Sequence, residues 1–174
     1  MEAIDRVYRF ALHLTRDPAD AEDLVQETYL RAYRHRHQYQ PGTNCTAWLF
    51  TICRHLWVQQ RRRGDRVTAY DIPELDALAG RYLEDRPSEG AGVLLDLPEF
   101  GDVLRKALEE IPEVYRLPIV LVDIEDQSYA AAAQILGVPV GTVRSRLFRG
   151  RRMLQARLLA YAEDAGILRS KGEG

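Results

Sequence analysis

Residues 128–152 of this chain read SYAAAAQILGVPVGTVRSRLFRGRR, and their pattern predicts the structure of its second half. Ser128 is a favourable helix N-cap, and the alanine-rich run 129–136 has high helix propensity. Gly137 supplies a left-handed residue that ends this helix, and Pro139 stands where a second helix would begin. Two short helices with a tight turn between them predict a helix-turn-helix.

The second of these helices has one packing side and one basic side. At about 100° per residue, apolar residues recur on one side; they are Val143, Leu147, Leu154 and Leu158. The opposite side is predicted to be exposed and carries Arg144, Ser145, Phe148, Arg149 and Arg152. An exposed arginine-rich helix fits the major groove of B-DNA, where guanidinium groups neutralise phosphates or bond guanine edges. A merely solvated surface helix is the alternative, but the preceding helix and glycine turn favour DNA binding.

The charges of the 174-residue chain are segregated along it. Lysine and arginine total 24 against 26 acids, so the formal net charge is only −2. Acids dominate residues 71–102, whereas arginine is concentrated at 54–66 and 144–157. An acidic middle therefore separates two basic ends, which is compatible with nucleic-acid binding despite the slightly negative net charge.

Several classes of protein and site are not expected. Two cysteines cannot form a disulfide framework, no apolar run approaches the ~20 residues of a membrane span, and the N-terminus has no signal-peptide pattern. Cys53 and His55 lie two residues apart on a predicted helix and so point apart. We therefore expect a cytoplasmic protein without membrane insertion, metal site or cofactor.

The first half is predicted to be a three-helix bundle, with helices at about 2–15, 18–36 and 45–63. The second helix has a packing stripe of Ala21, Leu24, Val25, Thr28 and Ala32. This stripe leaves Asp23 and Glu27 on another side, available to a partner. A loop centred on Pro41-Gly42 precedes the third helix, whose Arg54 is expected to lie on the outside.

The rest of the chain is divided between a linker and a second helical domain. Prolines, glycines and acids without clear periodicity predict a flexible linker at 65–97. Residues 117–122 have the composition of a buried strand, but no second strand candidate exists to pair with them, so we predict a helix despite Pro118. The predicted fold is all-α, with small domains at 1–64 and 98–162, each burying a modest core, and a frayed tail at 163–174.

Four stretches together carry a family resemblance. They are residues 20–28 (DAEDLVQET), 47–49 (AWL), 111–113 (IPE) and 137–147 (GVPVGTVRSRL). In this order they resemble the extracytoplasmic-function (ECF) group of bacterial sigma factors. The resemblance implies that the first domain corresponds to sigma region 2 and the second to region 4. It also implies a dissociable promoter-specificity subunit of RNA polymerase that performs no chemistry itself.

The resemblance assigns roles to particular residues. It places polymerase docking, on the clamp helices of the largest subunit, at Asp23, Gln26 and Glu27. It places reading of the duplex −35 element at Thr142, Arg144, Ser145, Phe148, Arg149 and Arg152. Contacts to the melted, single-stranded −10 element fall on Tyr39, Thr43, Asn44, Trp48, Arg54, Arg61 and Arg62. For Trp48 a core role is favoured over base stacking, because it lies on the apolar stripe of its helix.

The chain also departs from the family pattern, and other functions stay open. Ala132 is small where a larger core residue is usual, and Gln127 is polar where an apolar residue is usual. A free-standing dimeric helix-turn-helix regulator is the main alternative. A zinc-dependent switch or enzyme using Cys45, Cys53 and nearby histidines is the second. The sequence leaves open the promoter, the inducing signal and whether an anti-sigma factor binds.

Overall fold

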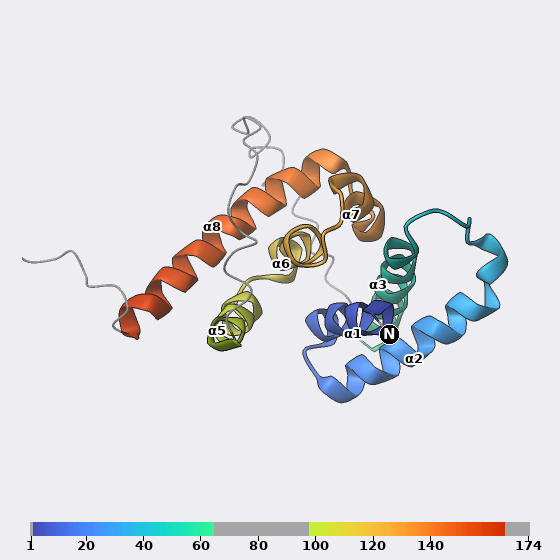
Figure 1. Ribbon diagram of the computed structural model, residues 1–174, viewed down its shortest axis with the longest axis horizontal. Helices are drawn as coiled ribbons and strands as arrows, with labels where there is room; N and C mark the ends of the chain where they lie inside the picture. The colour runs from blue at the N-terminus through green and yellow to red at the C-terminus, as the bar shows by residue number, and fades with distance from the viewer. Residues whose placement is uncertain (1, 65–97, 166–174) are drawn as a thin grey trace, which may run out of the picture.

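The computed structural model describes residues 2–64 and 98–165, and within these ranges the chain forms helices and no strand (Figure 1). The first half contains α1 (Glu2–Thr15), α2 (Pro18–Arg34), the 3₁₀ turn η1 (Arg36–Gln38) and α3 (Cys45–Gly64). The second half contains α5 (Pro98–Glu109), α6 (Glu113–Ile119), the π-helix η2 (Val120–Ile124), α7 (Tyr129–Leu136) and α8 (Val140–Asp164). The predicted all-α fold is confirmed. The predicted linker at 65–97 and most of the predicted tail lie outside the described residues.

The helix-turn-helix forms where the sequence places it. The Ser128 hydroxyl caps α7 by accepting a hydrogen bond from the Ala131 amide at 3.1 Å. Gly137 ends α7 in the left-handed conformation, with φ 67°, and Pro139 is the N-cap of α8. A residue without a Cβ adopts this positive φ at no steric cost, which explains the glycine.

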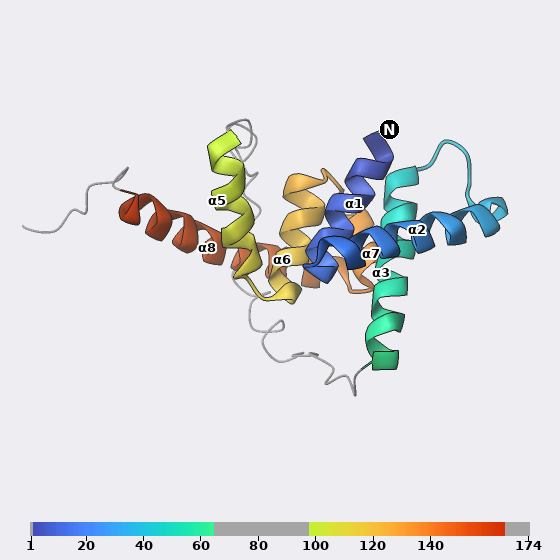
Figure 2. The same cartoon turned by 90° about the horizontal axis from the view of Figure 1, so that it is seen from below.

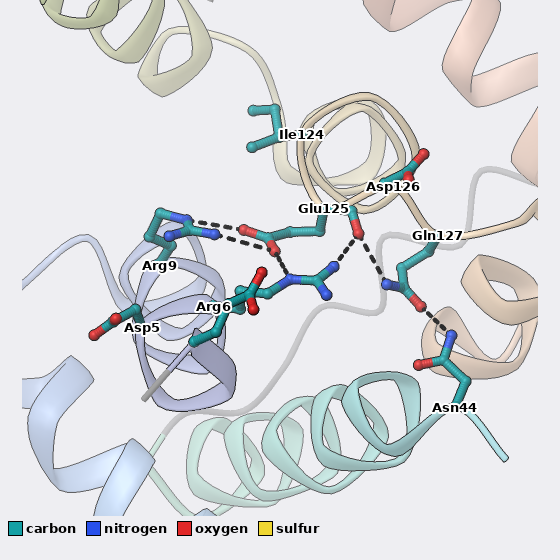
Figure 3. Close-up of a pocket in the computed structure, with 9 residues that line it drawn as sticks. Asp5, Arg6, Arg9, Asn44, Ile124, Glu125, Asp126 and Gln127 are labelled. Carbon is teal, nitrogen blue, oxygen red and sulfur yellow. Dashed lines mark hydrogen bonds and ion pairs between the residues drawn. The ribbon is translucent and has the colours of Figure 1, made fainter. Parts of the chain in front are cut away.

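Residues 117–122 are helical, as predicted, but the helix changes type after Pro118. Proline has no N–H for the preceding turn, and α6 passes directly into the wider π-helix η2. The Glu125 amide donates to the Val120 carbonyl at 2.8 Å, and the Gln127 amide donates to the Leu121 carbonyl at 2.8 Å. Asp126, between them, has a φ of 52°. This turn points the side chains of Glu125 and Gln127 at the first half of the chain (Figure 3).

The two halves share one apolar core, which was not predicted from the sequence. Phe10 of α1 and Phe50 of α3 pack with ring centroids 4.7 Å apart. The same buried cluster continues through second-half residues, namely Leu117, Val120, Leu121, Ala132, Ala133, Ile135, Leu136 and Val143. Leu108, Ile111, Ile119 and Leu147 form a second, smaller cluster. The prediction that each half buries a modest core is therefore only partly right, because the larger cluster contains residues of both halves and α7 packs against α3.

The candidate binding residues of α8 lie in its first turns, beside α7, and not at the far end of this long helix (Figure 1). The long helix α8 extends to one end and α2 to the other (Figures 1 and 2). Ala132, the small residue noted above, is fully buried in the shared core.

Candidate nucleic-acid and partner interfaces

The acidic face of α2 is separate from its packing stripe, as predicted. Asp23 and Gln26 are exposed and Glu27 is half-buried. All five stripe residues are buried; these are Ala21, Leu24, Val25, Thr28 and Ala32. The Thr28 hydroxyl is satisfied by the Leu24 carbonyl at 2.7 Å, which allows a polar residue inside the stripe. The acidic side chains of this face are therefore not required for packing.

The first turns of α8 present a basic face. Arg144, Phe148 and Arg152 are exposed, and Thr142 and Arg149 are half-buried. The Arg144 guanidinium lies 5.7 Å from the Tyr129 ring centroid, and that of Arg152 lies 5.9 Å from the Phe148 ring. These cation–π contacts hold the two guanidinium groups over the rings and leave their N–H donors available to a ligand.

Ser145 is the exception, and its predicted exposure was wrong. Its residue is only 1 % exposed, and its hydroxyl donates to the Thr142 carbonyl at 3.1 Å. A single apolar stripe predicted one buried side, but α8 packs against α6 and α7 as well as α5. The buried arc is therefore wider than the stripe, and Ser145 supports the start of α8 instead of facing solvent.

The loop before α3 is ordered by its own polar groups. The Tyr39 hydroxyl donates to the Thr43 carbonyl at 2.9 Å, and the Tyr39 and Trp48 rings pack with centroids 5.2 Å apart. Trp48 is half-buried against the shared core, in keeping with the favoured core role. Asn44 caps α3 by accepting from the Ala47 amide at 3.0 Å. The Asn44 amide nitrogen meanwhile donates across to second-half Gln127 at 3.0 Å (Figure 3).

The arginines of α3 differ in their surroundings. Arg62 is exposed, whereas Arg61 pairs with Glu113 of the second half at 3.0 Å. The outside position predicted for Arg54 was wrong: it is half-buried, and its buried Nε has no hydrogen-bond partner among the described residues. Burial lowers the pKa of Arg54, against a smaller opposing effect of Glu113. Second-half packing against this side of α3 explains the difference.

A polar pocket of about 500 Å³ lies between the two halves (Figure 3). It is centred on Glu125, whose residue is 1 % exposed. The Glu125 carboxylate accepts from Arg6 Nε at 2.8 Å and from Arg9 Nε at 3.0 Å, and Arg6 also donates to the Glu125 carbonyl. This cluster was not predicted from the sequence, although Arg6 and Arg9, which are three residues apart, share one face of α1. Gln127, noted above for being polar, donates to the Glu125 carbonyl at 2.9 Å.

Arg116 forms a second polar contact between the halves. It is 1 % exposed, and it donates to the Ile111 carbonyl at 2.9 Å and to the first-half His13 carbonyl at 3.0 Å. Burial, followed by the nearby Arg16 charge, lowers the pKa of Arg116 to about 10. Burial and then Arg116 also lower the pKa of His13 to about 4, so the imidazole is neutral at pH 7.

The described part of the chain contains no cluster of ligands for the metal site that was considered as an alternative. There, no three His, Cys, Asp or Glu residues are grouped so that they could hold a metal ion. Cys45 is exposed and Cys53 is buried, where burial raises the pKa of its thiol to about 12. In residues 2–64 and 98–165 no helix has the length and apolar character needed to cross a membrane.

Comparisons with known proteins agree with this arrangement. Residues 2–67 match the family model for Sigma-70 region 2, and residues 101–154 match that for Sigma-70, region 4. The chain is 37% identical over 161 residues to the ECF RNA polymerase sigma factor SigE of Mycolicibacterium smegmatis, covering 92% of this chain and 60% of that protein. It is also 37% identical over 167 residues to the ECF RNA polymerase sigma factor EcfG of Rhodopseudomonas palustris, covering 95% and 87%. A solved structure of the sigma factor RpoE in complex with the anti-sigma factor NepR from Bartonella quintana is similar, with a TM-score of 0.64 and 32% identity over 91% of this chain and 92% of that one.

Proposed function

The chain belongs to the ECF RNA polymerase sigma factors, and we propose that it is an alternative sigma factor that binds core RNA polymerase and directs promoter-specific initiation. The observation that carries this proposal is the order of the two family matches, region 2 over residues 2–67 and then region 4 over residues 101–154. The proposal assigns the chain no chemistry of its own. It acts in the cytoplasm with the polymerase.

The α2 face would dock on the clamp helices of the largest polymerase subunit. Asp23 and Gln26 are exposed and Glu27 is half-exposed, and none of them belongs to the packing stripe. Carboxylates there are suited to basic side chains of a partner, with hydrogen bonds stronger than those between neutral groups.

The start of α8 would read the −35 element in the major groove. Arg144 and Arg149 can make bidentate contacts to guanine, and the exposed Phe148 can contact a thymine methyl group. Arg152, further along the helix, is placed for a phosphate. Thr142 lies at the helix start, where polar groups commonly contact the DNA backbone.

The first half would contact the melted −10 element through the Tyr39–Asn44 loop and the arginines of α3. Tyr39 and Trp48 offer aromatic rings for base stacking, and Thr43 offers polar atoms for a base edge. Arg62 is exposed and suited to a phosphate, whereas Arg61 is paired with Glu113 of the second half and Arg54 is half-buried.

Two further points concern partners. A free-standing dimeric regulator does not account for the region 2 match over residues 2–67, and we set it aside. A relative of known structure is bound to the anti-sigma factor NepR, which supports the proposal that an anti-sigma factor also binds this chain.

The test is reconstitution with core RNA polymerase followed by run-off transcription. The variant Asp23→Lys with Glu27→Lys should weaken core binding at least tenfold, because both side chains face the partner. A matched control reverses the charge of two exposed acids on another helix, Glu163→Lys with Asp164→Lys, and should bind normally. Helix content and melting temperature should be unchanged in both. Wild-type protein that fails to bind core polymerase would refute the function, and normal binding by the α2 variant would refute only the docking face.

A further inference from the structure

Tyr129 lies where the two helices of the helix-turn-helix meet. It is the first residue of α7, and α7 packs beside the start of α8 (Figure 1). The residue is half-buried, and its side chain packs against both apolar clusters of the molecule. A side chain that is close-packed on several sides has little freedom to change its rotamer. The Tyr129 ring is therefore a fixed surface next to the recognition residues of α8.

Arg144 is the recognition residue that lies over this ring. Its guanidinium carbon is 5.7 Å from the centroid of the Tyr129 ring, within the range of a cation–π attraction. Arg144 is exposed, and among residues 2–64 and 98–165 no carboxylate forms an ion pair with it. A carboxylate partner would have to be released before DNA could bind, whereas a ring face attracts the cation and uses none of its N–H donors.

The other cation–π contact of α8 has a different character. Arg152 lies over the ring of Phe148, but both residues belong to α8 and both are exposed, Phe148 by 43%. Exposed side chains change rotamer within nanoseconds, so this ring does not fix the arginine relative to another element. Tyr129, in contrast, connects Arg144 to a neighbouring helix.

Tyr129 also acts on a second arginine, Arg151. Arg151 donates to the Asp123 carboxylate at 2.9 and 2.6 Å. The pKa of Arg151 is raised, chiefly by these hydrogen bonds and to a smaller extent by Tyr129. Phenylalanine at position 129 would keep the ring and remove only the hydroxyl, so the effects of the two groups can be measured separately.

We propose that Tyr129 is a positioning residue for promoter recognition, whose ring holds the Arg144 guanidinium in place to contact a base of the −35 element. This inference rests on the proposed function. An unrestrained arginine loses rotamer freedom when it binds a base, and an arginine already held over a fixed ring loses less. The ring should therefore increase the affinity for the preferred −35 sequence and the discrimination against other bases at the position that Arg144 contacts.

Tyr129→Leu removes the ring face and keeps an apolar side chain in the core. Holoenzyme with this variant should bind the preferred −35 sequence about two- to fivefold more weakly, which is the size of an exposed cation–π contact. The affinity should change little on a sequence in which the base contacted by Arg144 is replaced. That base is the one at which Arg144→Ala no longer discriminates. In the Arg144→Ala background, Tyr129→Leu should have no further effect, because the side chain that it positions is absent.

Two variants serve as controls. Tyr129→Phe retains the ring and should keep the wild-type affinity and discrimination. Tyr161→Leu makes the same change at another half-buried tyrosine, whose hydroxyl donates to Glu110 at 2.6 Å near the far end of α8. This matched control should leave the discrimination among −35 sequences unchanged.

Fluorinated phenylalanines at position 129 give a second test, which remains valid if Tyr129→Leu unfolds. Fluorine withdraws electron density from the ring face and changes the shape of the ring little. The affinity for the preferred sequence should therefore decrease as the number of fluorines increases. Circular dichroism and thermal unfolding check that each variant is folded.

The position of Arg144 can also be measured without polymerase. In NMR spectra of the free full-length chain, the Nε–H resonance of Arg144 should have an aromatic ring-current shift. Tyr129→Leu should remove this shift and Tyr129→Phe should retain it. Absence of the shift in the wild-type protein would overturn the contact itself.

The binding results distinguish a positioning role from a packing role. An equal loss on every −35 sequence, or the same loss in the Arg144→Ala background, would mean that Tyr129 only supports the fold, and the inference would be wrong. A fluorinated series with constant affinity would also overturn it. Wild-type holoenzyme that does not recognise a promoter would instead overturn the proposed function, while the ring-current shift would still report the contact.

Discussion

Gly150 allows α8 to lie directly against α6, and Gly150→Ala should destabilise the protein. A Cβ at this position would lie 2.7 Å from the Tyr115 carbonyl oxygen and 2.9 Å from Ile119 Cδ1. The isoleucine methyl can move, but the carbonyl is part of the α6 backbone. The two helices must therefore separate by several tenths of an ångström, in a core that is close-packed.

The size of the effect follows from two opposing terms. Alanine improves helix propensity by about 1 kcal/mol relative to glycine in a helix interior. Overpacking of a buried site costs about 1–3 kcal/mol, and contact with a backbone oxygen places this site near the upper end. We expect the free energy of unfolding to decrease by about 1–2 kcal/mol, which for a protein of this size corresponds to a decrease of about 2–8 °C in Tm.

The matched control is Gly101→Ala in α5, where an added Cβ would meet nothing within 4 Å. This variant should gain helix propensity without a steric clash, and its free energy of unfolding should increase by about 0.5–1 kcal/mol. Thermal and urea unfolding of both variants, followed by circular dichroism, give the comparison. Equal stabilisation by the two substitutions would mean that α8 does not contact α6 as closely as the structure shows.

Two further predictions concern the recognition helix and a buried histidine. Arg149→Ala should weaken binding by ~1–3 kcal/mol on the preferred −35 sequence and by little on a sequence that lacks the contacted guanine. Arg152→Ala should weaken binding to all sequences alike and reduce the slope of log affinity against log salt concentration by about one. Holoenzyme binding to a base-substitution series measures both, and equal losses on every sequence would leave Arg149 as only an electrostatic contact. The His13 pKa of about 4 lies below its value of 6.5 in the unfolded chain, so the unfolded state takes up the proton first and stability should fall as pH decreases from about 6.5 to 4. The folded protein with His13→Gln should lose less stability over that interval in urea titrations, and an identical pH dependence would contradict the burial of the imidazole.

The local structure of this protein could be predicted from its sequence. Ser128, Gly137 and Pro139 set the boundaries of the helix-turn-helix, because caps and breakers act within a few residues. The packing stripe of α2 could also be predicted from a local pattern, because residues three and four apart share a helix face. The stripe in turn separated Asp23 and Glu27 from the core. The family resemblance rests on these local patterns, and both family matches confirm it.

The additional helix faces that are buried depend on long-range packing and could not be predicted from the sequence. Ser145 and Arg54 lie off the main apolar stripes, and they are buried or half-buried because a second element packs on them. Helical periodicity identifies one buried side of a helix, but it does not identify a second element, distant in sequence, that packs on another side. The Glu125 contacts join residues 116 and 119 positions apart, and no local signal specifies that separation. The shared core and the polar contacts between the halves thus depend on how α1 and α3 meet α6, η2 and α7, which is a property of packing in three dimensions.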